Sequence, residues 1–219
     1  SSRTKGADLG HGNVRTLLFS LALPTITSQI VNMLYNLVDR VYIGHIQPAD
    51  TVGALALTGG GVCFPIIILI SAFAALMGMG GAPRASIQEG RGDMKGAEQI
   101  MGNCLTMLVI TSLVLTAVFQ LFAKPLLLTF GGSENTIGYA LDYMRIYTMG
   151  TLFVQVTLGM NAFITAQGFT SVSMKTVLIG AFLNTILDPI FIFLLGMGVR
   201  GAALATVISQ AVSALWVMR

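Results

Sequence analysis

The sequence has 219 residues, of which 54% are hydrophobic and only 10% are charged, with a net charge of +3. Soluble domains carry about 25% charged residues, so this composition predicts an integral membrane protein. The lysines and arginines are scattered at the ends of apolar runs and form no basic stripe, which argues against nucleic acid as a partner.

Six apolar segments follow a short start, residues 1–15, that is expected to be a cytosolic leader. Each segment is near or above the ~20 residues needed to cross ~30 Å of hydrocarbon, and none alternates with a period of two. The segments cover 16–43, 52–78, 98–122, 137–166, 173–195 and 201–218. The sequence therefore predicts an all-α membrane protein with one six-transmembrane-helix domain over 16–219.

The basic residues of the connecting segments predict how this domain lies in the membrane. The loops 44–51, 123–136 and 196–200 carry only Lys124 and Arg200, whereas the other side carries eight basic residues: Arg3, Lys5, Arg15, Arg84, Arg91, Lys95, Lys175 and Arg219. Because Lys and Arg are retained on the cytoplasmic side, the N-terminus is expected in the cytoplasm of a multi-pass protein of the cell (inner or plasma) membrane. The charged stretch between the second and third segments is expected to be a cytosolic turn.

The first segment carries four polar residues on one face, within an arc of about 80°: Gln29, Asn32, Asn36 and Asp39. Such a stripe must face other helices or a water-filled cavity rather than lipid. Hydrogen bonding between helices is the simpler interpretation for Gln29 and Asn32. For Asn36, hydrogen bonding and a functional role both stay open. A carboxylate inside a membrane is costly, so Asp39 is predicted to be functional. Asn161 in the fourth segment can line a cavity or hydrogen-bond another helix.

A second acid, Asp188, lies in the fifth segment, with Asn184 one turn earlier on the same face. At ~1.5 Å per residue from the outer helix ends, three side chains reach similar depths: Asp39 at ~7 Å, Thr206 at ~9 Å and Asp188 at ~12 Å. Two carboxylates, an amide oxygen and a hydroxyl suit a small cation such as Na⁺, or a stored proton. Two acids this close would repel, so one holds a proton unless a cation lies between them.

Charged and proline residues near these acids suggest further roles. A purely structural acid pair bridged by Arg40 is the alternative, although Arg40 itself is expected to reach the outer surface and not to join the site. Asp142 and Arg145 are expected to pair near an interface. Pro24 and Pro189 share helices with the acids and remove backbone hydrogen bonds, so they are expected to allow helix bending.

Several catalytic signatures are absent from the sequence. It has no Walker A motif, no HExxH, no GxGD element beside its aspartates and no convincing Ser–His pair. We therefore expect a protein that is not an enzyme and has no cofactor. An ion-coupled carrier, with Na⁺ or H⁺ as the coupling ion, is the simplest class.

Three stretches together resemble one family: LALPTITSQIVNMLYNLVDRVYIG, AFAALMGMGGAPRASIQEGRGD and NAFITAQGFTSVSMKTVLIGAFLNTILDPIFIFLLGMGVRGAALATVISQ. They are similar to the N-terminal half of bacterial multidrug and toxic compound extrusion (MATE) transporters, within the multidrug/oligosaccharidyl-lipid/polysaccharide exporter superfamily. The resemblance implies one six-helix lobe of a two-lobe, twelve-helix fold. It also implies that a second lobe, absent from this chain, is a partner.

The resemblance implies exchange of Na⁺ or H⁺ for organic, often cationic drugs by alternating access. It places the cation site on Asp39, Asn184, Asp188 and Thr206, and it matches Pro24 to a proline associated with bending of the first helix. Two other functions stay open. One is a lipid-linked oligosaccharide flippase of the same superfamily, which would need a cationic cavity, and the other is a non-transporting membrane scaffold or binding subunit.

Overall fold

The computed structural model describes residues 13–219, and the predicted leader falls mostly on residues 1–12, outside the described part. All regular structure in the described part is helical. The helices are α1 (Val14–Gly44), α2 (Ala54–Gly90), α3 (Met94–Leu121), α4 (Ala123–Thr129), α5 (Ile137–Met149), α6 (Thr151–Ala166), α7 (Thr170–Pro189) and α8 (Val199–Val217), with π-helical turns at Ala49–Gly53 and Ile190–Leu194. The predicted all-α class is confirmed.

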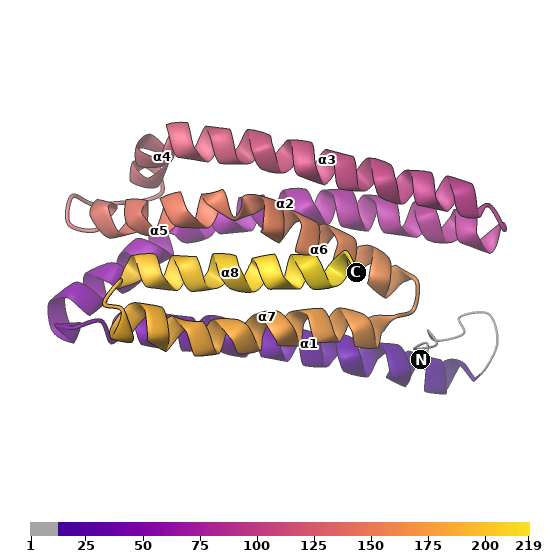
Figure 1. The fold of residues 1–219 in the computed structure, drawn as a ribbon, viewed down its shortest axis with the longest axis horizontal. Helices are drawn as coiled ribbons and strands as arrows, with labels where there is room; N and C mark the ends of the chain where they lie inside the picture. The colour runs from indigo at the N-terminus through magenta and orange to yellow at the C-terminus, as the bar shows by residue number, and fades with distance from the viewer. Residues whose placement is uncertain (1–12) are drawn as a thin grey trace.

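Five of the described helices are long and apolar enough to cross a membrane, or six spans if the bent pair α5 and α6 is counted as one. The helices form an elongated bundle in which α1 and α3 lie on opposite sides (Figure 1). The start of α1 and the α2–α3 turn lie at one end, and the α1–α2 and α7–α8 connections lie at the other. Neighbouring spans therefore run in opposite directions along the bundle.

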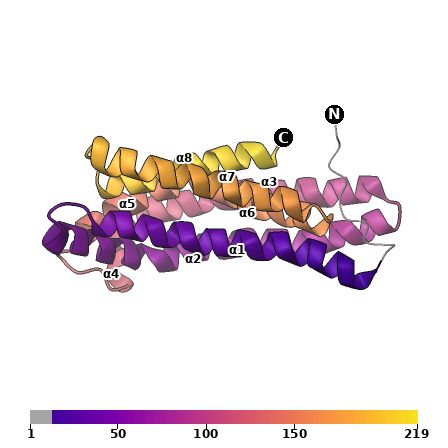
Figure 2. The ribbon, with the colours of Figure 1, turned by 90° about the horizontal axis from the view of Figure 1, so that it is seen from below.

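Helix α1 is the least embedded element of the bundle. It packs mainly against α7 and touches α2 far less, although α2 follows it in the chain. Figure 2 shows α1 running alongside α7 and overlapping α2 in that view. By contrast, α2 packs closely on α3 and α6. Close packing there depends on small residues, since a Cβ on Gly78 would lie 2.9 Å from Ala162 Cβ. Helices α2, α3 and α6 therefore form a closely packed unit, and α1 contacts the bundle mainly through α7.

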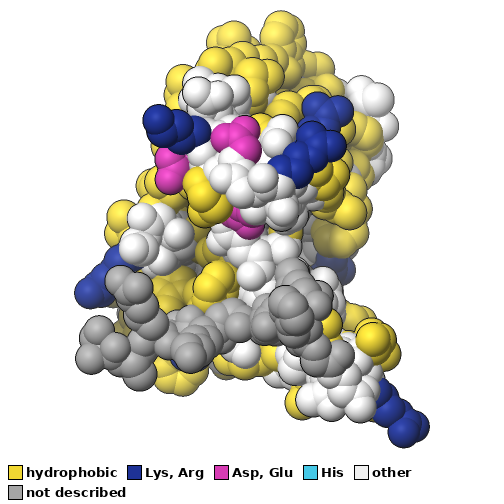
Figure 3. All heavy atoms as spheres, turned by 90° about the vertical axis from the view of Figure 1, so that its right-hand side faces the viewer, with side chains coloured by type: hydrophobic (Ala, Val, Ile, Leu, Met, Phe, Trp, Pro, Cys, Tyr) yellow, Lys and Arg dark blue, Asp and Glu magenta, His cyan; other side chains and the backbone are white. Residues whose placement is uncertain are grey.

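The second predicted segment is much shorter than the helix that contains it. Helix α2 continues to Gly90, and the turn is only Arg91–Asp93 before α3 begins. The Asp93 side chain accepts a hydrogen bond from the backbone amide of Gly96 (2.9 Å) and caps α3. Figure 3, which looks at this end, shows Lys, Arg and acidic side chains gathered on it, between largely apolar flanks. The stretch expected to be a charged turn is therefore mostly helix.

The fourth predicted segment is not one helix, because the chain bends by 57° between α5 and α6. The break lies at Gly150, where a Cβ would come within 2.6 Å of Val207 on α8. Gln120 of α3 donates from Nε2 to the Arg145 carbonyl and to Thr148 Oγ1, both at 2.7 Å. The close approach to α8 explains the glycine, and side chains satisfy the backbone groups near the bend.

The expected pairing of Asp142 with Arg145 is wrong. Arg200, at the start of α8, donates to Asp142 Oδ1 at 2.9 Å instead. Helices α5 and α8 pack against each other, so the guanidinium reaches across to the neighbouring helix. The pair connects the N-terminal parts of α5 and α8, which are distant in sequence.

The two prolines near the acids have different local effects. Helix α1 runs through Pro24 as one helix, and the Ser28 hydroxyl donates to the Pro24 carbonyl at 2.9 Å. Pro189 ends α7, and a wider π-helical turn follows, in which the Leu195 amide bonds the Ile190 carbonyl at 2.9 Å. The helix that carries Asp188 thus changes its winding directly after the acid.

Candidate functional site

The two acids of the apolar segments come together where α1 packs on α7. Asp39 is on α1 and Asp188 is on α7, and their carboxyl groups lie beside each other. Asp188 has no exposed surface, whereas Asp39 is partly buried at the edge of a pocket. Two carboxyl groups in a low-dielectric setting cannot both stay ionised without a compensating positive charge.

Asn184 connects this pair to α8. Its Nδ2 donates to Asp188 Oδ1 and to Thr206 Oγ1, each at 3.3 Å, and only 2% of its surface is exposed. The Thr206 hydroxyl in turn donates to the Ala202 carbonyl at 3.0 Å. The Thr206 hydroxyl therefore donates once and accepts once, and Thr206 lines the same pocket as Asp39. All four predicted ligands lie in one layer across α1, α7 and α8.

Three buried oxygens of this layer have no hydrogen-bond partner: Asp39 Oδ1, Asp188 Oδ2 and Asn184 Oδ1. Unpaired buried acceptors are costly and uncommon in proteins, so their occurrence on three neighbouring side chains favours a ligand that supplies positive charge or a proton. Among the residues described, no group of three or more His, Cys, Asp or Glu side chains is placed to hold a metal ion. The oxygen set suits a weakly held hard cation or a proton rather than a transition metal.

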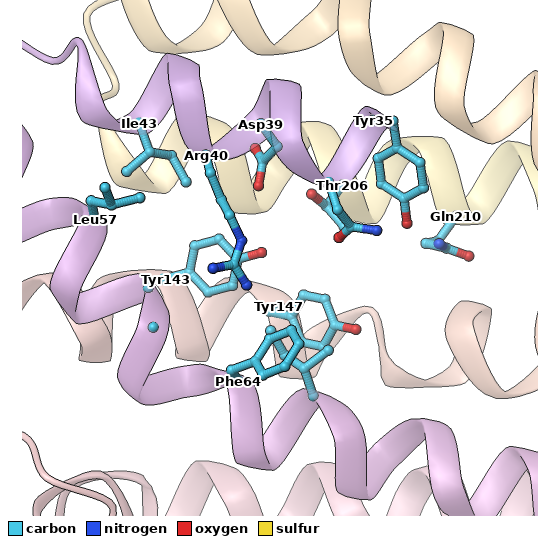
Figure 4. Close-up of a pocket in the computed structure, with 14 residues that line it drawn as sticks. Tyr35, Asp39, Arg40, Ile43, Leu57, Phe64, Tyr143, Tyr147, Thr206 and Gln210 are labelled. Carbon is cyan, nitrogen blue, oxygen red and sulfur yellow. The ribbon is translucent and has the colours of Figure 1, made fainter. Parts of the chain in front are cut away.

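A small pocket of about 100 Å³ opens beside Asp39 and Thr206. Figure 4 shows Asp39 staying close to α1, while Arg40 extends from α1 toward Phe64 of α2. The Arg40 guanidinium lies 5.1 Å from the centre of the Phe64 ring. Arg40 is exposed, and it lines the same pocket as Asp39. Its expected approach to the outer membrane surface stays a prediction.

The walls of the small pocket include side chains that the sequence analysis did not select. Tyr143 and Tyr147 of α5 stack at 5.9 Å between ring centres and line it, as do Tyr35 and Gln210. A signal existed for two of them, since Tyr35 lies one turn before Asp39 and Gln210 one turn after Thr206. The α5 tyrosines depend on tertiary packing, and nothing in their local sequence marks them.

A larger cavity of about 750 Å³ lies between α1, α2, α6, α7 and α8, and it is lined by hydroxyl, amide and apolar side chains with no charged residue. Its walls include Gln29, Asn32, Asn36 and Asn161, the residues predicted to face other helices or a cavity. Asn161 Oδ1 and Gln210 Oε1 are buried acceptors without partners. The cavity can hold an organic molecule with hydrogen-bond donors.

The two cavities share part of one wall. Seven residues line both: Tyr35, Asn36, Phe64, Ile67, Tyr147, Thr206 and Gln210. Asn184 lines the large cavity and also hydrogen-bonds Asp188 in the acidic layer. A change in the acidic layer can therefore alter the shape of the large cavity without any long-range relay.

Comparison with curated proteins finds relatives over nearly the whole chain. The multidrug export protein MepA of Staphylococcus haemolyticus (strain JCSC1435) is 28% identical over 199 residues, 91% of this chain and 43% of that protein. The probable multidrug resistance protein YpnP of Bacillus subtilis (strain 168) is 25% identical over 214 residues, 97% of this chain and 46% of that protein. The chain spans about half the length of these curated relatives.

Solved structures show the same half-length match. A structure described as the outward-facing conformation of a multidrug resistance MATE family transporter of the MOP superfamily superposes with a TM-score of 0.87 at 28% identity, covering 99% of this chain and 47% of that one. A MATE structure in the bent conformation gives a TM-score of 0.84 at 28% identity, over 94% of this chain and 45% of that one. The family model MatE matches residues 24–190. The chain therefore belongs to the MatE family.

Proposed function

We propose that this chain is the N-terminal lobe of a cation-coupled antiporter, which exports organic, often cationic, small molecules by alternating access. The observation that carries the proposal is the presence of three unpaired buried oxygens on neighbouring side chains, beside a neutral cavity of about 750 Å³. The relatives described as multidrug export proteins support the substrate class. Na⁺ or H⁺ is the coupling ion.

Cation binding would join side chains from three helices at one place. Asp39 belongs to α1, whereas Asp188 and Asn184 belong to α7 and Thr206 to α8. An ion held by all four would draw α1 onto the α7–α8 pair, and loss of the ion would release it through carboxylate repulsion. Pro24 in α1 and Pro189 beside Asp188 are the proposed bending points. Such bending is possible because α1 contacts the bundle mainly through one helix, α7.

A complete transport path requires more than the described lobe. The chain matches only 43% to 48% of the relatives and structures compared with it, so we propose that a second six-helix lobe supplies the opposite wall. The lobe lies in the cell membrane with its N-terminus in the cytoplasm, as the distribution of basic residues in the loops indicates. Small organic molecules and the lipid bilayer are its other partners.

An oligosaccharide flippase is the alternative within the superfamily. Its lipid-linked substrate carries a pyrophosphate, which favours a cavity with Arg or Lys side chains. No charged side chain lines the large cavity in the described residues, and Arg40 lines only the smaller pocket. This difference favours drug export.

The proposed function is tested by the melting temperature of the full-length protein across Na⁺ concentration, at several pH values and constant ionic strength. A bound ion stabilises by RT ln(1 + [Na⁺]/Kd), about 2.7 kcal/mol at 100 times Kd. The stabilisation should shrink as pH falls, because protons compete with Na⁺ for the same carboxylates. Asp188→Asn should remove both dependences.

Asp142→Asn is the matched control, since it removes a carboxylate from the exposed α5–α8 pair and leaves the acidic layer intact. If Asp188→Asn responded to Na⁺ and pH as the wild type does, the acidic layer would not be the cation site. A wild type that responds only to pH would identify a proton-coupled protein.

A further inference from the structure

Arg40 lies within the membrane-spanning length of α1, where its side chain is exposed and lines the pocket of Asp39. It is four residues from Gly44 at the end of α1, a rise of about 6 Å. Its guanidinium lies over Phe64, which is ten residues, or about 15 Å, into α2. The side chain therefore extends inward from its backbone position. A charged group at such depth is costly and usually has a function.

The neighbouring helix leaves room for this guanidinium. Gly60 and Gly61 of α2 line the same pocket, and a Cβ added to either would meet no atom within 4 Å. Gly59 differs, because a Cβ added there would lie 3.0 Å from Tyr139 Cβ. The glycine at this position therefore allows close packing of α2 on α5. The two open glycines are therefore not explained by helix packing, and they widen the pocket shared by Arg40 and Asp39.

Arg40 also has no direct carboxylate partner among the side chains that the structure describes. Among the described residues, the ion pair with a nitrogen–oxygen distance within 4.0 Å joins Arg200 to Asp142 and does not include Arg40. The Phe64 ring face holds the guanidinium, and the aromatic contact leaves the positive charge uncancelled. Its field therefore acts on the acidic site that shares its pocket, where Asp39 is the facing carboxylate.

We propose that Arg40 is the fixed counter-charge that selects monovalent over divalent cations at the Asp39–Asp188 site. Two carboxylates and one guanidinium leave the site with one net negative charge, which a single monovalent ion neutralises. A divalent ion would leave an uncompensated positive charge in a low-dielectric region. The inference rests on the proposed cation-coupled function and adds the charge rule of that site.

The charge rule has a quantitative signature. Coulomb energy scales with the charge of the bound ion, so removing Arg40 changes the free energy of divalent binding twice as much as that of monovalent binding. At an effective dielectric constant of about 20, a unit charge about 12 Å from the ion changes monovalent affinity about tenfold and divalent affinity about 100-fold, and a closer charge changes both by more. A structural role of Arg40 would change both affinities by the same factor.

The test measures Na⁺ and Ca²⁺ affinities of the full-length protein from melting-temperature titrations at ionic strength held constant with choline chloride. Arg40→Met removes the charge and keeps an unbranched side chain over Phe64, whereas Arg40→Lys keeps the charge and is the matched control. Arg40→Met should raise Ca²⁺ affinity about tenfold more than Na⁺ affinity. Arg40→Lys should keep the wild-type preference for Na⁺.

A double variant checks the rule from the opposite direction. Asp39→Asn with Arg40→Met again leaves one net negative charge, so the gain in Ca²⁺ affinity should disappear. Arg40→Gln provides a second neutral variant if Arg40→Met does not fold. Equal changes in Na⁺ and Ca²⁺ affinity in a folded neutral variant would overturn this inference and leave the proposed function standing. No response of the wild type to any cation or to pH would instead overturn the proposed function.

Discussion

The two cavities differ in the property that decides what each can hold. The small pocket of about 100 Å³ is lined by Asp39 and Arg40, whereas no charged side chain lines the cavity of about 750 Å³. The charged side chains line the small pocket, which has room for an ion but for little else. The larger cavity is lined by hydroxyl, amide and apolar side chains. Under the proposed function, the ion and the organic molecule would therefore bind in different cavities of one lobe.

The separation is incomplete, and the shared wall is the informative part. Thr206 and Gln210 of α8 line both cavities, and Asn184 links the acidic layer to the larger one. An ion that engages Asn184 and Thr206 competes with their hydrogen bond and moves atoms that also face the larger cavity. Antiport requires such competition between two ligands, and the following predictions test how separate the two cavities are.

The largest effect is expected from Asp188→Asn. Asp188 is completely buried and contributes one of the unpaired oxygens, so the variant should lose cation-dependent export in reconstituted vesicles as well as the ion-dependent stability. Uptake or efflux of a fluorescent drug under an imposed Na⁺ or pH gradient measures this. Wild-type export at normal expression would contradict the separation of roles.

A smaller effect, confined to the other cavity, is expected from Ser71→Phe. Ser71 of α2 lines only the larger cavity, and its hydroxyl bonds to the Ile67 carbonyl of its own helix at 3.0 Å. The added ring should reduce export of bulky molecules roughly tenfold, about 1.4 kcal/mol, while the melting-temperature response to Na⁺ stays unchanged. Ser71→Ala is the control for loss of the hydroxyl, and a lost Na⁺ response would show that the cavities cannot be separated.

A stability comparison of neighbouring glycines separates packing from pocket space. Gly59→Ala places Cβ 3.0 Å from Tyr139 and 3.1 Å from the Ala140 backbone, so it should destabilise by about 1–3 kcal/mol. Gly61→Ala meets no atom within 4 Å and should leave stability nearly unchanged. Thermal denaturation of both variants measures this difference. Equal losses of stability would contradict the open space at Gly61, in the pocket that Arg40 lines.

The smallest effect is expected from Asp142→Asn. The Arg200–Asp142 pair has 62% and 42% of its side-chain surface exposed, and exposed ion pairs stabilise little because water screens them. The melting temperature should change by little more than its error, and less in high salt than in low salt. A large loss would show that this outer pair matters as much as the buried acids.

Much of the fold followed from the sequence, because apolar runs near 20 residues with few charges restrict a chain to transmembrane helices. The resemblance to MATE transporters is likewise confirmed by the match of the family model to residues 24–190. The bend at Gly150 was not predicted, since its cause is the approach of Val207 from α8. The length of α2 was underestimated because hydropathy marks the membrane boundary and not the helix end.

The sequence by itself located the acids Asp39 and Asp188, because a carboxylate in an apolar segment stands out against its costly surroundings. It also indicated their similar depth, since the rise of a helix is constant. Only the tertiary structure decided which side chains surround them. The Arg40 guanidinium lies over Phe64 because α2 presents an aromatic face there, and Arg200 reaches Asp142 because α5 packs on α8. The direction of a long side chain depends on what the neighbouring helix presents, which no local pattern contains.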